Sequence, residues 1–247
     1  MTRPQLRDPD RALGRAALRA RAWAQVPAVV LGGWQPARRV PLRRMLGMVP
    51  RHTMVSLPVL AATHRAAADV VARGVAGAIV ECGVWNGGSA AILAGAALDA
   101  GDPRPVHLFD SFAGLPPPTA EDGAAVARQF FDGWCVGDAA EARRALAAVG
   151  QDPAATHVYE GWFEETFPEA ETGPIAVLHI DADWYEPVRL ALERFYPLLQ
   201  PGGALLLNDY GRWPGCDRAT DEYLGGLGLG PGALRPLART GAVLIKP

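Results

Sequence analysis

Residues 78–89 read AIVECGVWNGGS, and this stretch decides the fold. It opens with a nearly continuous apolar run, which is typical of a strand buried on both faces of a sheet. The glycines that follow let the backbone turn tightly and approach a ligand closely. An alanine-rich segment comes next. The stretch therefore predicts a strand at 78–84, a tight turn and a helix at 88–100.

The same alternation of apolar and alanine-rich runs continues to the C-terminus. A helix at 57–73 leads into it. Further strands are expected at 106–110, 157–160, 175–181, 203–208 and 241–245, and further helices at 139–149, 186–198 and 216–225. Such alternation predicts right-handed crossovers and a doubly wound, mainly parallel α/β sheet. Ligands of these sheets bind outside the carboxyl ends of the strands.

The chain has 247 residues and a net charge of −2, which gives no reason to expect a nucleic acid or an anionic membrane as partner. The charge is unevenly distributed. Residues 1–51 carry eleven Arg and two acids, a balance of +9, and the remainder carries −11. A basic arm could contact nucleic acid or membrane, but its spread-out charges favour a flap or a subunit contact. We expect helices at 6–25 and 42–48, and a division into an arm (1–56) and a main domain (57–247).

The three cysteines, Cys82, Cys135 and Cys216, are far apart and lack the spacing of metal ligands. Reduced thiols in a cytoplasmic protein are the simplest interpretation. We expect no secretory signal, because no apolar run with a small-residue cleavage site stands at the N-terminus. No apolar run approaches the roughly 18 residues of a membrane span.

The turn after the first strand differs from a dinucleotide-binding loop. From Gly83 the glycine spacing is G-x-x-x-G-G, and Glu81 precedes it. An acid there disfavours a pyrophosphate and suits a cationic ligand such as a sulfonium with its amino group, although a plain strand–helix turn is the alternative. Asp110 ends the second strand and is placed to bind ribose hydroxyls, as in nicotinamide and S-adenosylmethionine sites. Its alternative role is to cap the following turn.

Polar side chains end the fourth and fifth strands: Asp181 and Asp183 on one, Asn208 and Asp209 on the other. Neighbouring strands lie about 4.8 Å apart, so these groups can converge. Converged carboxylates repel unless a proton or a cation lies between them. Oxygen ligands suit Mg²⁺, Mn²⁺ or Ca²⁺. We expect Asp181, Asp209 and the amide oxygen of Asn208 to bind the metal, with Asp183 free to accept a proton; solvated loop residues are the alternative.

The chain resembles the macrocin O-methyltransferase family, which methylates sugar hydroxyls of glycosylated antibiotics. The matching stretches span residues 52–224. They are HTMV (52–55), VECGVWNGGSA (80–90), LFDSFAGLP (108–116), EGWFEETFP (160–168), HIDADWYEPV (179–188), FYPLLQPGG (195–203) and NDYGRWPGCDRATDEYL (208–224).

This resemblance implies a Rossmann-like class I methyltransferase fold with a seven-stranded sheet, S-adenosylmethionine as cofactor, and Mg²⁺ or Mn²⁺. The implied metal ligands are Asp181, Asn208 and Asp209, with Asp183 as base. The family usually has two acids where this chain has Asn208 and Asp209, so the site loses one negative charge. The implied cofactor-binding residues are Thr53, Met54, Glu81, Gly83, Ser89, Asp110, Ser111, Gly161, Trp162 and Asp181.

A sugar of a glycosylated natural product is the acceptor that the resemblance favours, and a homo-oligomer is the expected assembly. A catechol or polyphenol methyltransferase is the first alternative. A catalytically silent S-adenosylmethionine-binding protein with a degraded metal site is the second, and the glycine spacing disfavours a nicotinamide oxidoreductase. The acceptor pocket is expected from loops 26–56, 112–135 and 210–216. Its candidate lining residues are Trp134, Tyr185, Tyr210, Arg212 and Trp213.

Overall fold

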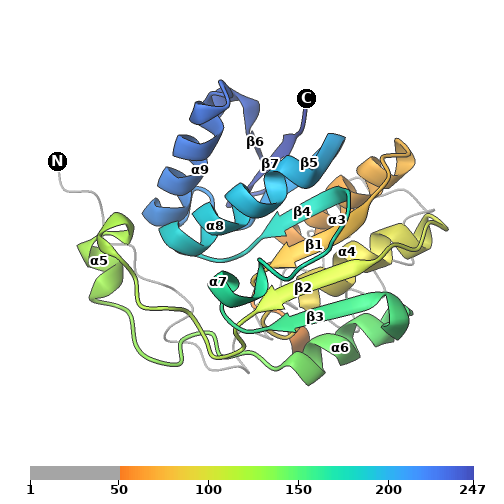
Figure 1. Cartoon of the computed structure of the whole chain (residues 1–247), viewed down its shortest axis with the longest axis horizontal. Coiled ribbons are helices and arrows are strands. Elements are labelled where there is room, and N and C mark those ends of the chain that lie inside the picture. Colours follow the sequence, from red (N-terminus) through yellow and green to blue (C-terminus); the bar gives the residue numbers. More distant parts are fainter. Residues whose placement is uncertain (1–50) are drawn as a thin grey trace.

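A computed structural model describes residues 51–247, except for the side chain of Pro231. These residues form a seven-stranded sheet in the order β3-β2-β1-β4-β5-β7-β6, with helices on both faces (Figure 1). The strands are β1 (Ala78–Cys82), β2 (Val106–Asp110), β3 (Thr156–Glu160), β4 (Ile175–Ile180), β5 (Leu199–Leu207), β6 (Arg235–Pro236) and β7 (Ala242–Ile245).

The sheet is parallel from β3 through β5, and β7 runs antiparallel to both β5 and β6. The chain builds outward from β1 to β2 and β3, then returns to add β4 on the other side of β1. This reversal makes the carboxyl ends of β1 and β4 the switch point, where an open α/β sheet binds its ligand.

Two helical layers cover the sheet (Figure 1). One layer holds α3 (Leu57–Ala72), α4 (Gly88–Asp99) and α6 (Ala139–Ala148); the other holds α7 (Phe163–Thr166), α8 (Tyr185–Phe195) and α9 (Pro214–Gly226). Each layer packs its own apolar cluster against the strands. Short 3-10 helices occur at Ala120–Asp122 (η2), Pro153–Ala155 (η3), Tyr196–Leu198 (η4) and Pro231–Ala233 (η5).

The predicted α/β class and the six predicted strands are confirmed, with differences at their ends. β5 begins at Leu199 rather than at residue 203, because the chain enters the sheet directly from η4. The two-residue strand β6 and the four-residue helices α5 (Ala124–Ala127) and α7 were not predicted, because they are too short to show a period. The predicted helices at 6–25 and 42–48 lie outside the described residues. Within residues 51–247, no helix is long and apolar enough to cross a membrane.

Candidate active site

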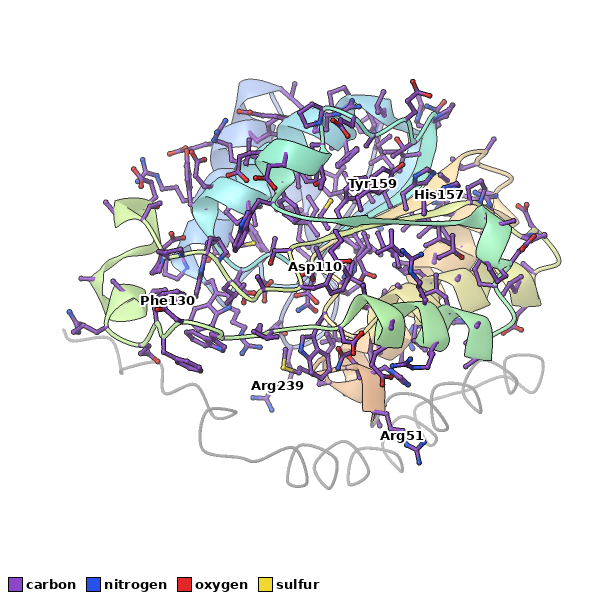
Figure 2. All side chains as sticks on the ribbon, turned by 60° about the horizontal axis from the view of Figure 1, so that its bottom comes forward. Arg51, Asp110, Phe130, His157, Tyr159 and Arg239 are labelled. Atoms are coloured by element: carbon purple, nitrogen blue, oxygen red, sulfur yellow. The ribbon has the colours of Figure 1, made fainter. Side chains whose placement is uncertain are left out.

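A cavity of about 550 Å³ opens at the carboxyl ends of β1, β2 and β4. Its volume falls within the range of roughly 300–1,000 Å³ that is usual for small-molecule sites. Figure 2 shows Asp110, one of its lining residues, toward the centre of the described molecule. Its walls come from the segment before α3, the turns after β1, β3 and β4, and a long connection after β2, which we name the flap segment (residues 112–136).

Asp110 holds the loop after β1 in place. Its Oδ2 accepts hydrogen bonds from the backbone N–H groups of Val84 at 2.6 Å and Trp85 at 2.8 Å, and its Oδ1 accepts one from Phe112 at 2.7 Å. A carboxylate offers about four acceptor positions. About one therefore remains for a ligand hydroxyl. The role in holding the turn is confirmed, and ribose binding stays a prediction that this geometry allows.

Two glycines allow the close approach of neighbouring backbone at the cavity wall. Gly83 has φ +86°, and a Cβ there would overlap the carbonyl oxygen of Asp181. A Cβ on Gly88, the first residue of α4, would overlap the carbonyl oxygen of His52 and the side chain of Thr53. Glycine at these positions brings the turn after β4 and the segment before α3 against the same cavity.

Glu81 lies beneath this cavity rather than on its wall. It is fully buried, and its Oε1 is 2.7 Å from Nδ1 of His179 on the neighbouring strand. Its Oε2 has no hydrogen-bond partner in the described part of the chain. His179 is buried as well, so the pair belongs to the core of the sheet. Glu81 lies next to that histidine and is not among the residues that line the cavity.

The polar groups after β4 and β5 converge as the sequence predicts. Asn208 Nδ2 donates to Asp181 Oδ1 at 2.7 Å, and the backbone N–H of Asp183 donates to Asp209 Oδ2 at 3.2 Å. Burial raises the pKa of both Asp181 and Asp209, and the charges of Asp209 and Asp183 raise the pKa of Asp181 further. Two buried carboxyls that cannot easily ionise together are typical of a site completed by a proton or a cation.

These groups fit a hard divalent cation. Oδ1 of Asn208 is buried and has no hydrogen-bond partner among residues 51–247, so these residues leave this oxygen available as a ligand. Two carboxylates and an amide oxygen, completed by water, form a donor set that Mg²⁺ or Mn²⁺ accepts. Within residues 51–247, no group of three His, Cys, Asp or Glu side chains could hold a metal, and the predicted set differs from such a group in having Asn208 as its third member.

Asp183 lines the cavity immediately beside this cluster. Its backbone has φ +56°, a left-handed conformation that is uncommon for a residue other than glycine. Aspartate and asparagine tolerate this conformation better than bulkier residues. The backbone conformation after β4 therefore determines the position of Asp183 at the cavity wall.

Most predicted cofactor-binding residues line the cavity together. They are Thr53, Met54, Gly83, Ser89, Asp110, Ser111, Trp162 and Asp181. Gly161 lies one residue before Trp162, and its N–H donates to the carbonyl oxygen of Asp110. Asn208 and Asp209 lie behind Asp181 and Asp183, which they contact.

The predicted acceptor-binding residues are placed differently, and none of them lines the cavity within the described residues. The hydroxyls of Tyr185 and Tyr210 bond to Glu222 and Asp221 on α9. Trp134 and Trp213 instead pack edge-on against the buried Trp184, which does line the cavity. Arg212 lies over the ring of Trp213. Loop 210–216 therefore supports the wall from behind.

Sequence reasoning missed several lining residues. The flap segment contributes Gly114, Leu115, Pro116, Pro117, Thr119, Asp122 and Cys135. Helix α7, the turn after β4 and the first turn of α8 contribute Phe163, Glu164, Glu165, Trp184, Glu186 and Pro187. Loop 112–135 was expected at the pocket, but its individual residues carry no periodic signal. The motifs EGWFEETFP and HIDADWYEPV did contain the others.

A seven-stranded sheet of this order, with a cavity at the switch point and an acid ending β2, defines a class I S-adenosylmethionine-dependent methyltransferase. The chain belongs to the Macrocin-O-methyltransferase (TylF) family, whose model matches residues 41–229. It is therefore an O-methyltransferase, and the predicted family and fold are confirmed.

Known proteins agree with this assignment. The chain is 36% identical over 183 residues to the 8-demethyl-8-(2,3-dimethoxy-alpha-L-rhamnosyl)-tetracenomycin-C 4'-O-methyltransferase of Streptomyces olivaceus, covering 72% of this chain and 69% of that one. It is 33% identical over 186 residues to the demethyldecarbamoylnovobiocin O-methyltransferase of Streptomyces niveus, with coverages of 70% and 67%. The solved O-methyltransferase NovP superposes with a TM-score of 0.71 at 29% identity, covering 79% of this chain and 82% of NovP.

Proposed function

We propose that this enzyme transfers a methyl group from S-adenosylmethionine to a sugar hydroxyl of a glycosylated natural product, with a divalent cation at Asp181, Asn208 and Asp209. The observation that carries the proposal is the convergence of Asp181 and Asp209 behind Asp183, at the wall of one cavity with Asp110. Two relatives are named as O-methyltransferases of a rhamnosyl-tetracenomycin and of demethyldecarbamoylnovobiocin, and these names support the acceptor class.

In this proposal the chain's residues divide the work of methyl transfer. Asp110 offers its remaining acceptor position to a ribose hydroxyl, and Gly83 lets the backbone approach the cofactor. Bound S-adenosylmethionine supplies an electrophilic methyl group on a sulfonium. A cation at Asp181, Asn208 and Asp209 would supply a Lewis acid that lowers the pKa of the acceptor hydroxyl. Asp183, next to that position, accepts the hydroxyl proton as the carbon–oxygen bond forms and the sulfur–methyl bond breaks, with the neutral thioether as leaving group.

The charged side chains of the cavity wall indicate which acceptor charge the site favours. Its carboxylates are Asp110, Asp122, Glu164, Glu165, Asp181, Asp183 and Glu186, and His52 is the one basic side chain among the described lining residues. A site of this sign attracts a cationic cofactor and repels phosphorylated acceptors. We infer that the acceptor is uncharged or cationic, which suits a sugar already attached to a neutral natural product.

An acceptor panel tests this function. The full chain is incubated with S-adenosylmethionine, Mg²⁺ and either glycosylated polyketides and aminocoumarins, simple catechols or nucleoside diphosphate sugars, and methylated products are identified by mass spectrometry. We expect turnover of glycosides only. Turnover of catechols alone would contradict the sugar acceptor and would indicate a phenolic acceptor instead. Absence of turnover with all three classes, together with S-adenosylmethionine binding, would favour a catalytically silent binding protein.

We further propose a homo-oligomer joined through the basic arm, supported by the charge of +9 on residues 1–51 against −11 on the remainder. Light scattering of a chain lacking residues 1–25 tests this assembly, and an unchanged particle mass would contradict it.

A further inference from the structure

The flap segment is held against the turn that carries Asp183 by two hydrogen bonds, which the turn donates and the flap segment accepts. From the turn, Nε1 of the buried Trp184 donates to the carbonyl oxygen of Pro116 at 2.9 Å. From the flap segment, Oδ1 of Asp122 accepts the backbone N–H of Tyr185 at 2.7 Å. Figure 1 shows α5, which follows Asp122 in the chain, beyond the carboxyl ends of the strands. Asp122 is therefore a side chain that connects the flap segment to the α/β domain.

The Asp122 side chain is almost completely buried, with 1% of its surface exposed. Besides the bond from Tyr185, its Oδ2 accepts hydrogen bonds from the N–H of Thr119 at 2.8 Å and from the Thr119 hydroxyl at 3.1 Å. A buried carboxylate with three donors is fixed in orientation, and removing it would leave those donors without partners. Asp122 is thus a rigid connection between η2 and the first residue of α8.

Helix α9 also packs closely against the Asp122 carboxylate. Gly215 lies in the first turn of α9, and a Cβ there would overlap Oδ1 of Asp122 and approach the backbone N of Tyr185 to 2.8 Å. The three elements η2, α8 and α9 therefore meet at one point that only glycine allows. A methyl group at residue 215 would displace the carboxylate from the Tyr185 N–H.

The turn between β4 and α8 is thereby held at both ends. At its start, the N–H of Asp183 donates to Asp209 Oδ2, and at its end the N–H of Tyr185 donates to Asp122 Oδ1. Between them, Asp183 adopts φ +56°, a conformation that persists only where the surroundings fix it. Loss of the second hold would allow the turn to relax and move the Asp183 carboxylate.

We propose that Asp122 is a positioning residue, which orients the Asp183 turn and the flap segment together through the Tyr185 N–H. It acts through the backbone and makes no contact with the reacting atoms. The effect on the reaction rests on the proposed role of Asp183, whereas the effect on the flap segment does not. Misplacing a catalytic group by about 1 Å can cost about a hundredfold in rate.

Three variants test this role: Asp122→Ala, which removes the carboxylate; Gly215→Ala, which displaces it without changing Asp122; and Gly225→Ala as the matched control. Gly225 lies in the same helix, and a Cβ there meets no atom within 4 Å. Hydrogen–deuterium exchange of peptides covering 112–136 and 182–187 reports on positioning. Steady-state kinetics and calorimetric S-adenosylmethionine binding report on function.

For Asp122→Ala and Gly215→Ala we expect faster exchange confined to these two peptides, kcat lowered about tenfold to a hundredfold, and cofactor Kd within twofold of the wild type. Gly225→Ala should behave as the wild type in all three measurements. Unchanged exchange in both peptides, or faster exchange over the whole sheet in Gly215→Ala, would overturn the proposal. If Asp122→Ala does not fold, Gly215→Ala alone decides. If the wild type has no methyltransferase activity, the proposed function fails while the exchange data still test Asp122.

Discussion

At the scale of single residues, Asp183 carries the proton-transfer role in the proposed reaction. Asn fits the same left-handed backbone conformation but cannot accept a proton, so Asp183→Asn removes the base with little strain. We expect kcat to fall by roughly 10²–10⁴-fold. Cofactor Kd, measured by calorimetry, should stay within twofold. Asp152→Asn, at an exposed aspartate that caps η3 at the amino end of β3, serves as control. Full activity of Asp183→Asn would assign the base elsewhere.

Asn208 sets the charge of the proposed metal site. Its Nδ2 donates to Asp181, and its buried Oδ1 has no hydrogen-bond partner in the part of the chain that the structure describes. Asn208→Asp adds a third carboxylate, so we expect the Mn²⁺ Kd, measured by electron paramagnetic resonance, to fall at least about tenfold. In chelator the same variant should unfold more easily, because three buried carboxylates repel. An unchanged Mn²⁺ Kd would remove residue 208 from the site.

The limits of sequence reasoning are also visible at this scale. Strand ends could be predicted, because apolar runs locate the strands and parallel strands bring their carboxyl ends to one edge; Asp110, Asp181 and Asp183 followed from that logic. The environment of Tyr210 could not. Its hydroxyl bonds to Asp221, eleven residues later. The packing of α9 determines this contact, and the local sequence does not predict it. The hold on Tyr185 by Asp122 spans 63 residues and was missed for the same reason.

At the scale of elements, a contact between β2 and β3 makes the stability of the fold depend on pH. His107 is buried beside Tyr159 and stacks on His157, and Figure 2 shows the latter two along β3. Burial, with a contribution from the charge of His157, lowers the pKa of His107 from 6.5 to about 4. Between these pH values the unfolded chain takes up a proton that the folded chain does not. Stability therefore falls as the pH falls through this window.

The variant His107→Gln tests this sign. Glutamine does not titrate and can still bond to the Tyr159 hydroxyl, so the loss of stability between pH 7 and about pH 5 should become smaller than in the wild type. Urea unfolding at both pH values measures it. His157→Gln is the control, because it keeps the His107 ring in place, and burial is the larger cause of the lowered pKa of His107, so the dependence on pH should persist. Equal slopes in the wild type and His107→Gln would contradict the assignment.

At the scale of the whole molecule, the site depends on segments that are distant in sequence. The segment before α3, the turns after β1, β3 and β4, and the flap segment share one cavity wall, and the crossover order of the sheet brings them together. The sheet supplies the acids, while the flap segment covers them. We expect changes in acceptor specificity to map to the flap segment, because the proposed function assigns the strand ends to cofactor and metal.

The central claim is that a divalent cation at the ends of β4 and β5 activates the acceptor beside Asp183. The most direct test is to strip the full chain with chelator and follow methyl transfer to a glycoside acceptor while Mg²⁺ is returned, with cofactor binding measured in parallel. We predict that methyl transfer is nearly absent in chelator and rises to saturation with Mg²⁺, while S-adenosylmethionine still binds the stripped enzyme. Methyl transfer at the same rate in chelator and in Mg²⁺ would contradict the claim.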